Sequence, residues 1–200
     1  SSRAQTALVL GVVFADGYLA LQAEDAPQCR HLGKDLLALA KTLGVHSELL
    51  DHCRSLLESS QKRDWPSLRR ELESTREHVG TALRAHEDDD LVTLITLGTG
   101  LRSTQIVAAI LKENYSERGA SLLRPPVHDL LREDSCARKC PKLQNDPMLN
   151  LISERLARME RVFTKDVSSP PSEAEVKALA DTMDSILNWY REEGLIFKGG

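Results

Sequence analysis

Two charged residues stand inside the most apolar segments of this 200-residue chain. Asp16 is the only charged residue between Ala7 and Ala23, and Arg102 is the only one between Leu91 and Leu111. An unpaired charge in an apolar core is strongly unfavourable, so each must find a partner or face a cavity. We expect the two segments to cross as helices and the two charges to pair there, which would fix the helix register.

A cavity at the same place is the alternative interpretation. The polar side chains near the two charges would then line a ligand-binding site, and these are Tyr18, Gln22, Ser103 and Gln105. In an enzyme of this kind, Asp16 would act as a buried acid or base and Arg102 would orient an anionic substrate. The sequence favours the structural pair, because no other catalytic motif accompanies it.

Four glycines in the same two segments would allow the backbones to approach closely where the segments cross. They are Gly11, Gly17, Gly98 and Gly100. The pair Leu10–Gly11 in the first segment recurs as Leu97–Gly98 in the second, which is a faint internal repeat.

The histidines, acidic residues and known motifs indicate neither a metal site nor a cofactor. None of the six histidines lies four residues from another, as a helical zinc site requires. The acidic run 87–90 after His86 lacks the spaced ligands of a calcium loop. Glu71 is interpreted as a solvated charge on an amphipathic face, like Glu73 and Glu77. Phosphate-binding, dinucleotide-binding and nucleophile motifs do not occur in the sequence.

Cys136 and Cys140 lie in a polar stretch, residues 133–145, that we predict to be a loop. Their spacing differs from the C-x-x-C of redox and zinc sites, but a disulfide between them would staple that loop in an exported protein. The chain begins Ser1–Ser2–Arg3 rather than with Met, as it would after removal of a signal peptide or after trimming. We therefore expect export to the periplasm, with the cytoplasm as the alternative.

The elements that must position these residues are helices. The two apolar segments are apolar on all sides, which is typical of helices at the centre of a bundle. The other helices carry apolar residues at helical spacing, and their expected starts are Asp25 with Pro27, Ser47, Asp64 with Pro66, Asp146 with Pro147, and Ser172 with Glu175. Arg124–Pro125–Pro126 is expected to stop a short helix. The sequence predicts one all-α domain over residues 1–200, an irregular bundle of about seven to eight helices around two central apolar ones.

Composition argues against two classes of partner. The net charge is −4, and basic residues are interleaved with acidic ones, so we expect no nucleic-acid binding. The apolar segments approach the length of a membrane span, but each contains a central charge, and the second also contains several polar residues, so we expect neither to span a membrane. An unknown small molecule or protein is the expected partner, and the oligomeric state is left open.

The N-terminal part of the chain also carries a resemblance. Leu10–Gly11, Ala15–Asp16–Gly17 and Leu21–Gln22–Ala23, followed by Leu32–Gly33–Lys34–Asp35, resemble a loose group of exported all-helical bacterial proteins of uncharacterised function. The resemblance covers roughly residues 1–60. It implies a helical fold and export, and it carries over no catalytic residues.

From these observations we expect a non-catalytic binding or interaction protein that acts outside the cytoplasm. The alternatives are the enzyme using Asp16 with Arg102, and a structural subunit of a larger assembly.

Overall fold

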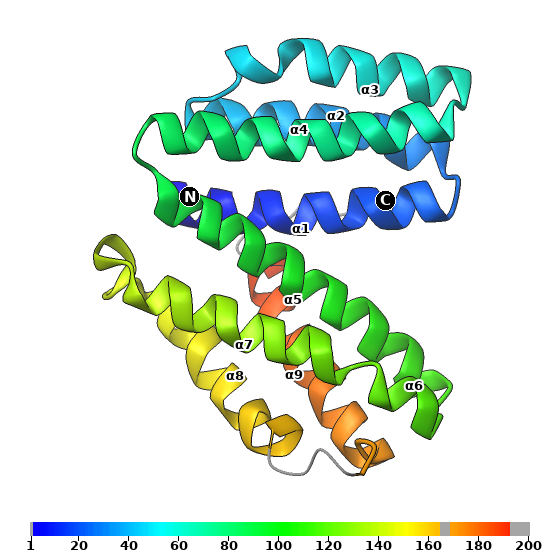
Figure 1. Ribbon diagram of the computed structural model, residues 1–200, viewed down its shortest axis with the longest axis vertical. Helices are drawn as coiled ribbons and strands as arrows, with labels where there is room; N and C mark the ends of the chain where they lie inside the picture. The colour runs from blue at the N-terminus through cyan, green and yellow to red at the C-terminus, as the bar shows by residue number, and fades with distance from the viewer. Residues whose placement is uncertain (1, 165–168, 193–200) are drawn as a thin grey trace. The chain divides into compact units, whose positions relative to one another are not determined.

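A computed structural model describes residues 2–164 and 169–192, and these residues form helices and no strands (Figure 1). The prediction of an all-α protein is confirmed. Eight helices have at least 13 residues, and α6 has five. Two short 3₁₀ turns, Ser47–Leu49 and Pro141–Leu143, precede α3 and α8. The helices are α1 Arg3–Gln22, α2 Ala26–Leu43, α3 Leu50–Lys62, α4 Trp65–Ala85, α5 Asp89–Glu113, α6 Glu117–Ser121, α7 Arg124–Lys139, α8 Pro147–Thr164 and α9 Glu173–Glu192.

The chain divides into two compact units, which we call unit 1 (Ser1–Thr99) and unit 2 (Gly100–Gly200). The border falls within α5. Unit 1 therefore contains α1 to α4 and the first half of α5, and unit 2 contains the second half of α5 and α6 to α9. The expectation of a single domain over residues 1–200 stays a prediction.

In unit 1, helices α1 to α4 run side by side, as the blue to green ribbons of Figure 1 show. Helix α1 contacts both α2 and α4. Every residue of α1 from Thr6 to Ala15 is buried, so this helix has no solvent-facing side over nearly three turns. The predicted role of α1 as a core helix is therefore confirmed.

Helices α1 and α5 are both long and apolar enough to cross a membrane. In α1, 72% of the most apolar window is buried inside the protein, and in α5 the share is 50%. A helix at the centre of a water-soluble bundle meets the same criteria of length and composition. The expectation that neither helix spans a membrane stays a prediction.

Within unit 1, the backbones of α1 and α5 approach so closely that two positions admit only glycine. A Cβ atom on Gly11 would overlap the carbonyl oxygen of Ile95, and one on Gly98 would overlap the carbonyl oxygen of Leu8. The contact is reciprocal, because each glycine meets the carbonyl three residues before the other glycine. Thr99 Oγ1 adds a hydrogen bond of 3.0 Å to the carbonyl oxygen of Gly11. The expected close approach is confirmed at the two glycines of the Leu–Gly repeat.

The other two glycines behave differently. A Cβ atom on Gly17 would meet the side chains of Leu32 and Leu72, and one on Gly100 would meet the side chain of Leu130 at 3.3 Å. Side chains can shift where a backbone cannot. These two glycines therefore aid packing without setting the distance between helix backbones.

Most of the predicted helix starts are confirmed by capping hydrogen bonds. Asp25 accepts from Gln28 N at 3.0 Å, Asp64 accepts from Ser67 N at 3.1 Å, and Asp146 accepts from Met148 N at 2.9 Å. Ser172 and Glu175 form both bonds of a capping box.

Ser47 is the exception among the predicted caps. It begins a 3₁₀ turn, Ser47–Leu49, and its hydroxyl donates to Glu48 at 2.8 Å. Helix α3 starts only at Leu50 and has no side-chain cap. The prediction was wrong here because the 3₁₀ turn separates Ser47 from α3, so Ser47 does not stand at the N-cap position of the helix.

In unit 2, the predicted boundaries around α7 are wrong. Pro125 and Pro126 lie in the first turn of α7, where a missing N–H has no helical partner to lose. The helix then continues to Lys139, through most of the segment expected to be a loop.

The buried face of α7 explains the error at its C-terminal half. Val127, Leu130, Asp134 and Ala137 follow each other at helical spacing and are all buried. One of these four residues is an aspartate, so the apolar pattern is interrupted in the sequence although the buried face of the helix continues. Asp134 accepts from Ser153 Oγ of α8 at 2.5 Å and from Arg138 Nε at 3.1 Å. Burial raises the pKa of Asp134 above its ordinary value, and these two hydrogen bonds oppose the shift.

Candidate functional site

The residues of the predicted Asp16–Arg102 site fall in both units. In unit 1, Asp16 and Tyr18 are half-buried on α1, and Gln22 is exposed. In unit 2, Arg102 is half-buried on α5 and Ser103 is exposed. Since the predicted pair joins a residue of one unit to a residue of the other, it stays a prediction.

Within unit 2, the structure connects Arg102 to a polar chain. Arg102 Nη1 donates to Gln105 Oε1, and Gln105 Nε2 donates to Asp184 Oδ1 of α9 at 2.6 Å. Gln105 is only 6% exposed, so this chain crosses apolar surroundings. Two of the predicted site residues are thus brought together. Asp184 was missed because it lies 79 residues further along the chain than Gln105 and meets it only through the packing of the helices.

A pocket of about 220 Å³ opens between α8 and α9 of unit 2. Five residues line it: Arg155, Arg158, Asp181, Thr182 and Ser185. Nη1 of Arg155 is buried and has no hydrogen-bond partner among the residues that the structure describes. A buried guanidinium N–H without an acceptor is unfavourable, since the group has lost water and gained nothing in return.

The other charges of the pocket have partners. Arg158 donates to Glu154 at 2.9 Å, and Asp181 lies 2.8 Å from Lys112 Nζ. The hydrogen bond from Lys112 lowers the pKa of Asp181 below its ordinary value, so Asp181 stays ionised at neutral pH. Arg155 therefore brings the pocket a positive charge with one buried N–H that lacks an acceptor among the described residues.

Arg155 has a signal in the sequence that could have identified it. It lies three residues after Ile152 and four before Met159, both of which are buried on the apolar face of α8. An arginine at this helical spacing from two buried residues lies at the edge of the core. Arg155 was not singled out from the sequence, where it is one of the basic residues interleaved with acidic ones.

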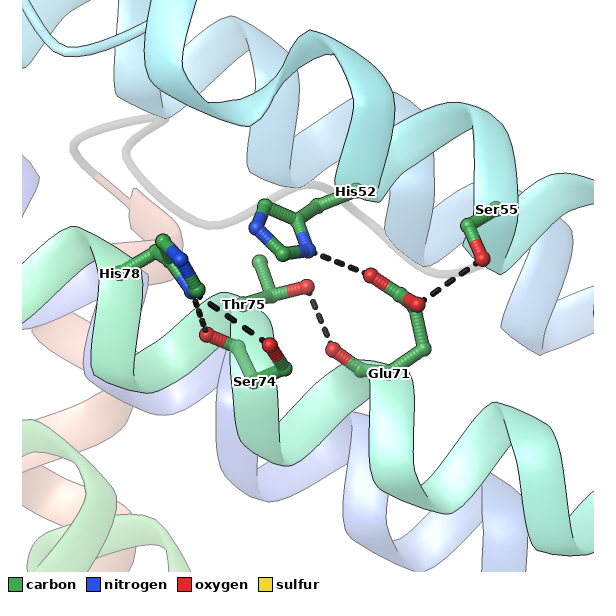
Figure 2. Close-up of polar contacts among 6 residues, drawn as sticks. All are labelled: His52, Ser55, Glu71, Ser74, Thr75 and His78. Atoms are coloured by element: carbon green, nitrogen blue, oxygen red, sulfur yellow. Dashed lines mark hydrogen bonds and ion pairs between the residues drawn. The ribbon is translucent and has the colours of Figure 1, made fainter.

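A second polar cluster lies in unit 1, between α3 and α4 (Figure 2). His52 Nδ1 is 2.5 Å from Glu71 Oε1, and Ser55 Oγ donates to Glu71 Oε2 at 2.9 Å. The side chain of Glu71 is 22% exposed, which corrects its interpretation as a solvated charge. The ring of His78 lies against that of His52, with the centroids 4.3 Å apart.

This cluster does not have the arrangement of a catalytic triad. Ser55 and His52 both bind the carboxylate of Glu71, each through a different oxygen. A nucleophilic serine needs its hydrogen bond to the histidine, which then takes the proton. Glu71 instead ties α3 to α4.

The cysteines differ in exposure and in chemistry. Cys136 is exposed near the end of α7 rather than in a loop, and Cys140 is half-buried, with Sγ 3.5 Å from the carbonyl oxygen of Cys136. Both are thiols in the structure, and the disulfide between them stays a prediction. Cys29 and Cys53 are buried; burial raises the pKa of both thiols, that of Cys53 to about 11.

We expect thiol alkylation at pH 8 to separate these groups. Cys136 should react with iodoacetamide while Cys29 and Cys53 remain unmodified, because the thiolate is the nucleophile and a raised pKa keeps it scarce. Denaturant should make the buried thiols reactive. Peptide mass spectrometry measures each site, and labelling of Cys53 as fast as Cys136 in the folded protein would contradict the burial of Cys53.

No protein-family model, curated protein or solved structure matches this chain. Among the described residues, no group of three or more His, Cys, Asp and Glu side chains is arranged to hold a metal ion. The pocket lined by Arg155 is the candidate binding site considered below.

Proposed function

We propose that this protein is a non-catalytic binding protein that holds a small oxyanion, a phosphate or a carboxylate, in the pocket between α8 and α9. The observation that carries the proposal is the buried Nη1 of Arg155, which lacks an acceptor among the described residues and belongs to a pocket-lining side chain. An oxyanion in the pocket supplies a negative charge to Arg155, and a rotation of the guanidinium toward the pocket lets the anion accept from Nη1. Arginine suits this role because its planar group binds two oxygens of one anion.

The lining favours a small and compact ligand. A volume of about 220 Å³ is below the range of about 300–1,000 Å³ that is usual for drug-sized ligands. Arg158 and the hydroxyl of Ser185 stand on opposite helices of the same pocket, where they can add hydrogen bonds to the anion. Asp181 limits the negative charge that the pocket accepts, although Lys112 largely neutralises it.

The same lining argues for binding rather than catalysis. The five lining residues include neither histidine nor cysteine. Asp181 is the one carboxylate among them, and its lowered pKa makes it a poor general base. The enzyme based on Asp16 and Arg102, and export to the periplasm, stay predictions from the sequence.

Titration calorimetry with inorganic phosphate at pH 7 tests the proposal, with acetate as the carboxylate arm. We expect saturable binding of one anion per chain. Arg155→Leu should weaken it about tenfold to a hundredfold, because a hydrogen bond to a charged group contributes about 1.5–3 kcal/mol. The fold should survive, since Arg155 is half-buried and leucine removes a buried nitrogen that has no hydrogen-bond partner among the described residues.

Arg132→Leu is the matched control for this titration. It removes the same charge from an exposed arginine of unit 2, on α7, that pairs with Asp129. Binding should be unchanged in this variant. Equal weakening in both variants would show a general charge effect, and the absence of saturable binding of either anion to the wild-type chain would refute the proposal.

A further inference from the structure

We infer that His52 and His78 form a two-histidine site in unit 1 for a divalent transition-metal ion that prefers imidazole ligands. The observation is their juxtaposition across α3 and α4, with each Nδ1 already hydrogen-bonded. The site is separate from the anion pocket of unit 2 and does not depend on it.

The hydrogen bonds of the two Nδ1 atoms decide which ring nitrogen can bind a metal. His78 Nδ1 lies 2.8 Å from the carbonyl oxygen of Ser74, which can only accept, so the proton of the neutral ring is on Nδ1. His52 Nδ1 lies 2.5 Å from the Glu71 carboxylate, which is likewise an acceptor. In both neutral rings the lone pair is therefore on Nε2.

The rings that carry the two Nε2 atoms are neighbours. The ring centroids are 4.3 Å apart and the rings are tilted by 46°. In Figure 2, the nitrogen of His52 that is not bonded to Glu71 lies on the side of the ring nearer His78. His78 is exposed, and the side chain of His52 is 18% exposed, so an ion can reach the pair from solvent.

The surroundings of the two rings match those of metal-binding histidines. Such histidines usually donate the second ring N–H to a carboxylate or a backbone carbonyl, which fixes the ring and strengthens the ligand. Here Glu71 supplies the carboxylate and Ser74 the carbonyl. Ser55, which donates to Glu71 at 2.9 Å, holds that carboxylate in place.

The ligand count limits which ion fits. No third His, Cys, Asp or Glu among the described residues completes a metal site, so water would occupy the other positions. Two imidazoles with open positions suit Cu²⁺ best, since divalent first-row affinities rise to copper and fall again at zinc. Mg²⁺ and Ca²⁺ prefer oxygen ligands and should not bind here.

Cu²⁺ titration of the full chain, followed by calorimetry and electron paramagnetic resonance, tests this inference. We expect one ion coordinated by two imidazole nitrogens. His78→Gln should remove one of the nitrogens and weaken binding at least tenfold, and Glu71→Gln should weaken it about tenfold to a hundredfold through the ring of His52.

His31→Gln is the matched control, because His31 is also exposed in unit 1 but lies on α2. It should leave the copper spectrum unchanged. His78→Gln carries the test even if variants of the half-buried His52 fold poorly, and circular dichroism checks the fold of each variant. Unchanged affinity in His78→Gln, or a spectrum of the wild-type complex with fewer than two imidazole nitrogens, would overturn the inference.

Discussion

Gly11→Ala is expected to destabilise unit 1 by about 3 kcal/mol or to prevent its folding. The added methyl group would overlap the carbonyl oxygen of Ile95 and lie 2.8 Å from the amide nitrogen of Thr99. Both are backbone atoms of α5, so relief requires a whole helix to move. Gly98→Ala should have a similar effect, because its methyl group would overlap the carbonyl oxygen of Leu8. Urea denaturation followed by circular dichroism gives the free energy of unfolding.

Gly33→Ala is the matched control for these variants. Its Cβ would meet the nearest atom, the carbonyl oxygen of Cys53, at an ordinary 3.7 Å. Alanine in the middle of α2 should therefore stabilise the helix by about 0.5–1 kcal/mol. Gly17→Ala should fall between the two extremes, since the side chain of Leu32 can move aside. If Gly11→Ala unfolds at the same urea concentration as Gly33→Ala, the close contact of α1 with α5 does not exist.

Phe14→Ala is expected to cost about 3–5 kcal/mol of the free energy of unfolding. Phe14 is fully buried in α1 and is the largest side chain among those with no solvent contact. Removal of the phenyl ring leaves a cavity, because α1 is buried on every side from Thr6 to Ala15. Thermal and urea unfolding measure the loss.

Leu19→Ala supplies the comparison on the same helix. Leu19 is 43% exposed, so its truncation should change stability by less than about 1 kcal/mol. The contrast between the two positions tests whether α1 is a buried core helix. Equal effects of the two substitutions would show that Phe14 is not buried more deeply than Leu19.

Local signals in the sequence predicted much of the fold. Asp25, Asp64 and Asp146 cap helices where the pattern of caps and prolines placed them. The burial of α1 followed from its apolar character on all sides, and four glycines of the two apolar segments were expected to allow close approach, which Gly11 and Gly98 do. The caps and the apolar character depend on residues close together in the chain, which is why they can be recognised without coordinates.

The failures arise where a polar residue occupies a structural position. Asp134 interrupts the apolar spacing of α7, so half of a helix looked like a loop. Ser47 has the side chain of a helix cap, but a 3₁₀ turn lies between it and the start of α3. In both places the outcome depends on local geometry that residue spacing alone does not encode.

The candidate sites were harder to predict than the fold. His52 and His78 are 26 residues apart and meet only because α3 pairs with α4. Arg155 was not a candidate, because the buried nitrogen without a hydrogen-bond partner among the described residues is seen only once α8 is packed in the fold. Contacts between residues distant in sequence depend on helix pairing, which a single sequence does not specify.

The most direct test of anion binding is side-chain NMR of ¹⁵N-arginine-labelled protein during a phosphate titration at constant ionic strength. The Arg155→Leu variant assigns the Arg155 signal by its loss. We predict that this signal shifts and saturates with the same dissociation constant that calorimetry gives, while the signal of Arg132 stays in place. An Arg155 signal that does not move, or that drifts in step with Arg132 without saturating, would contradict the binding of an anion in this pocket.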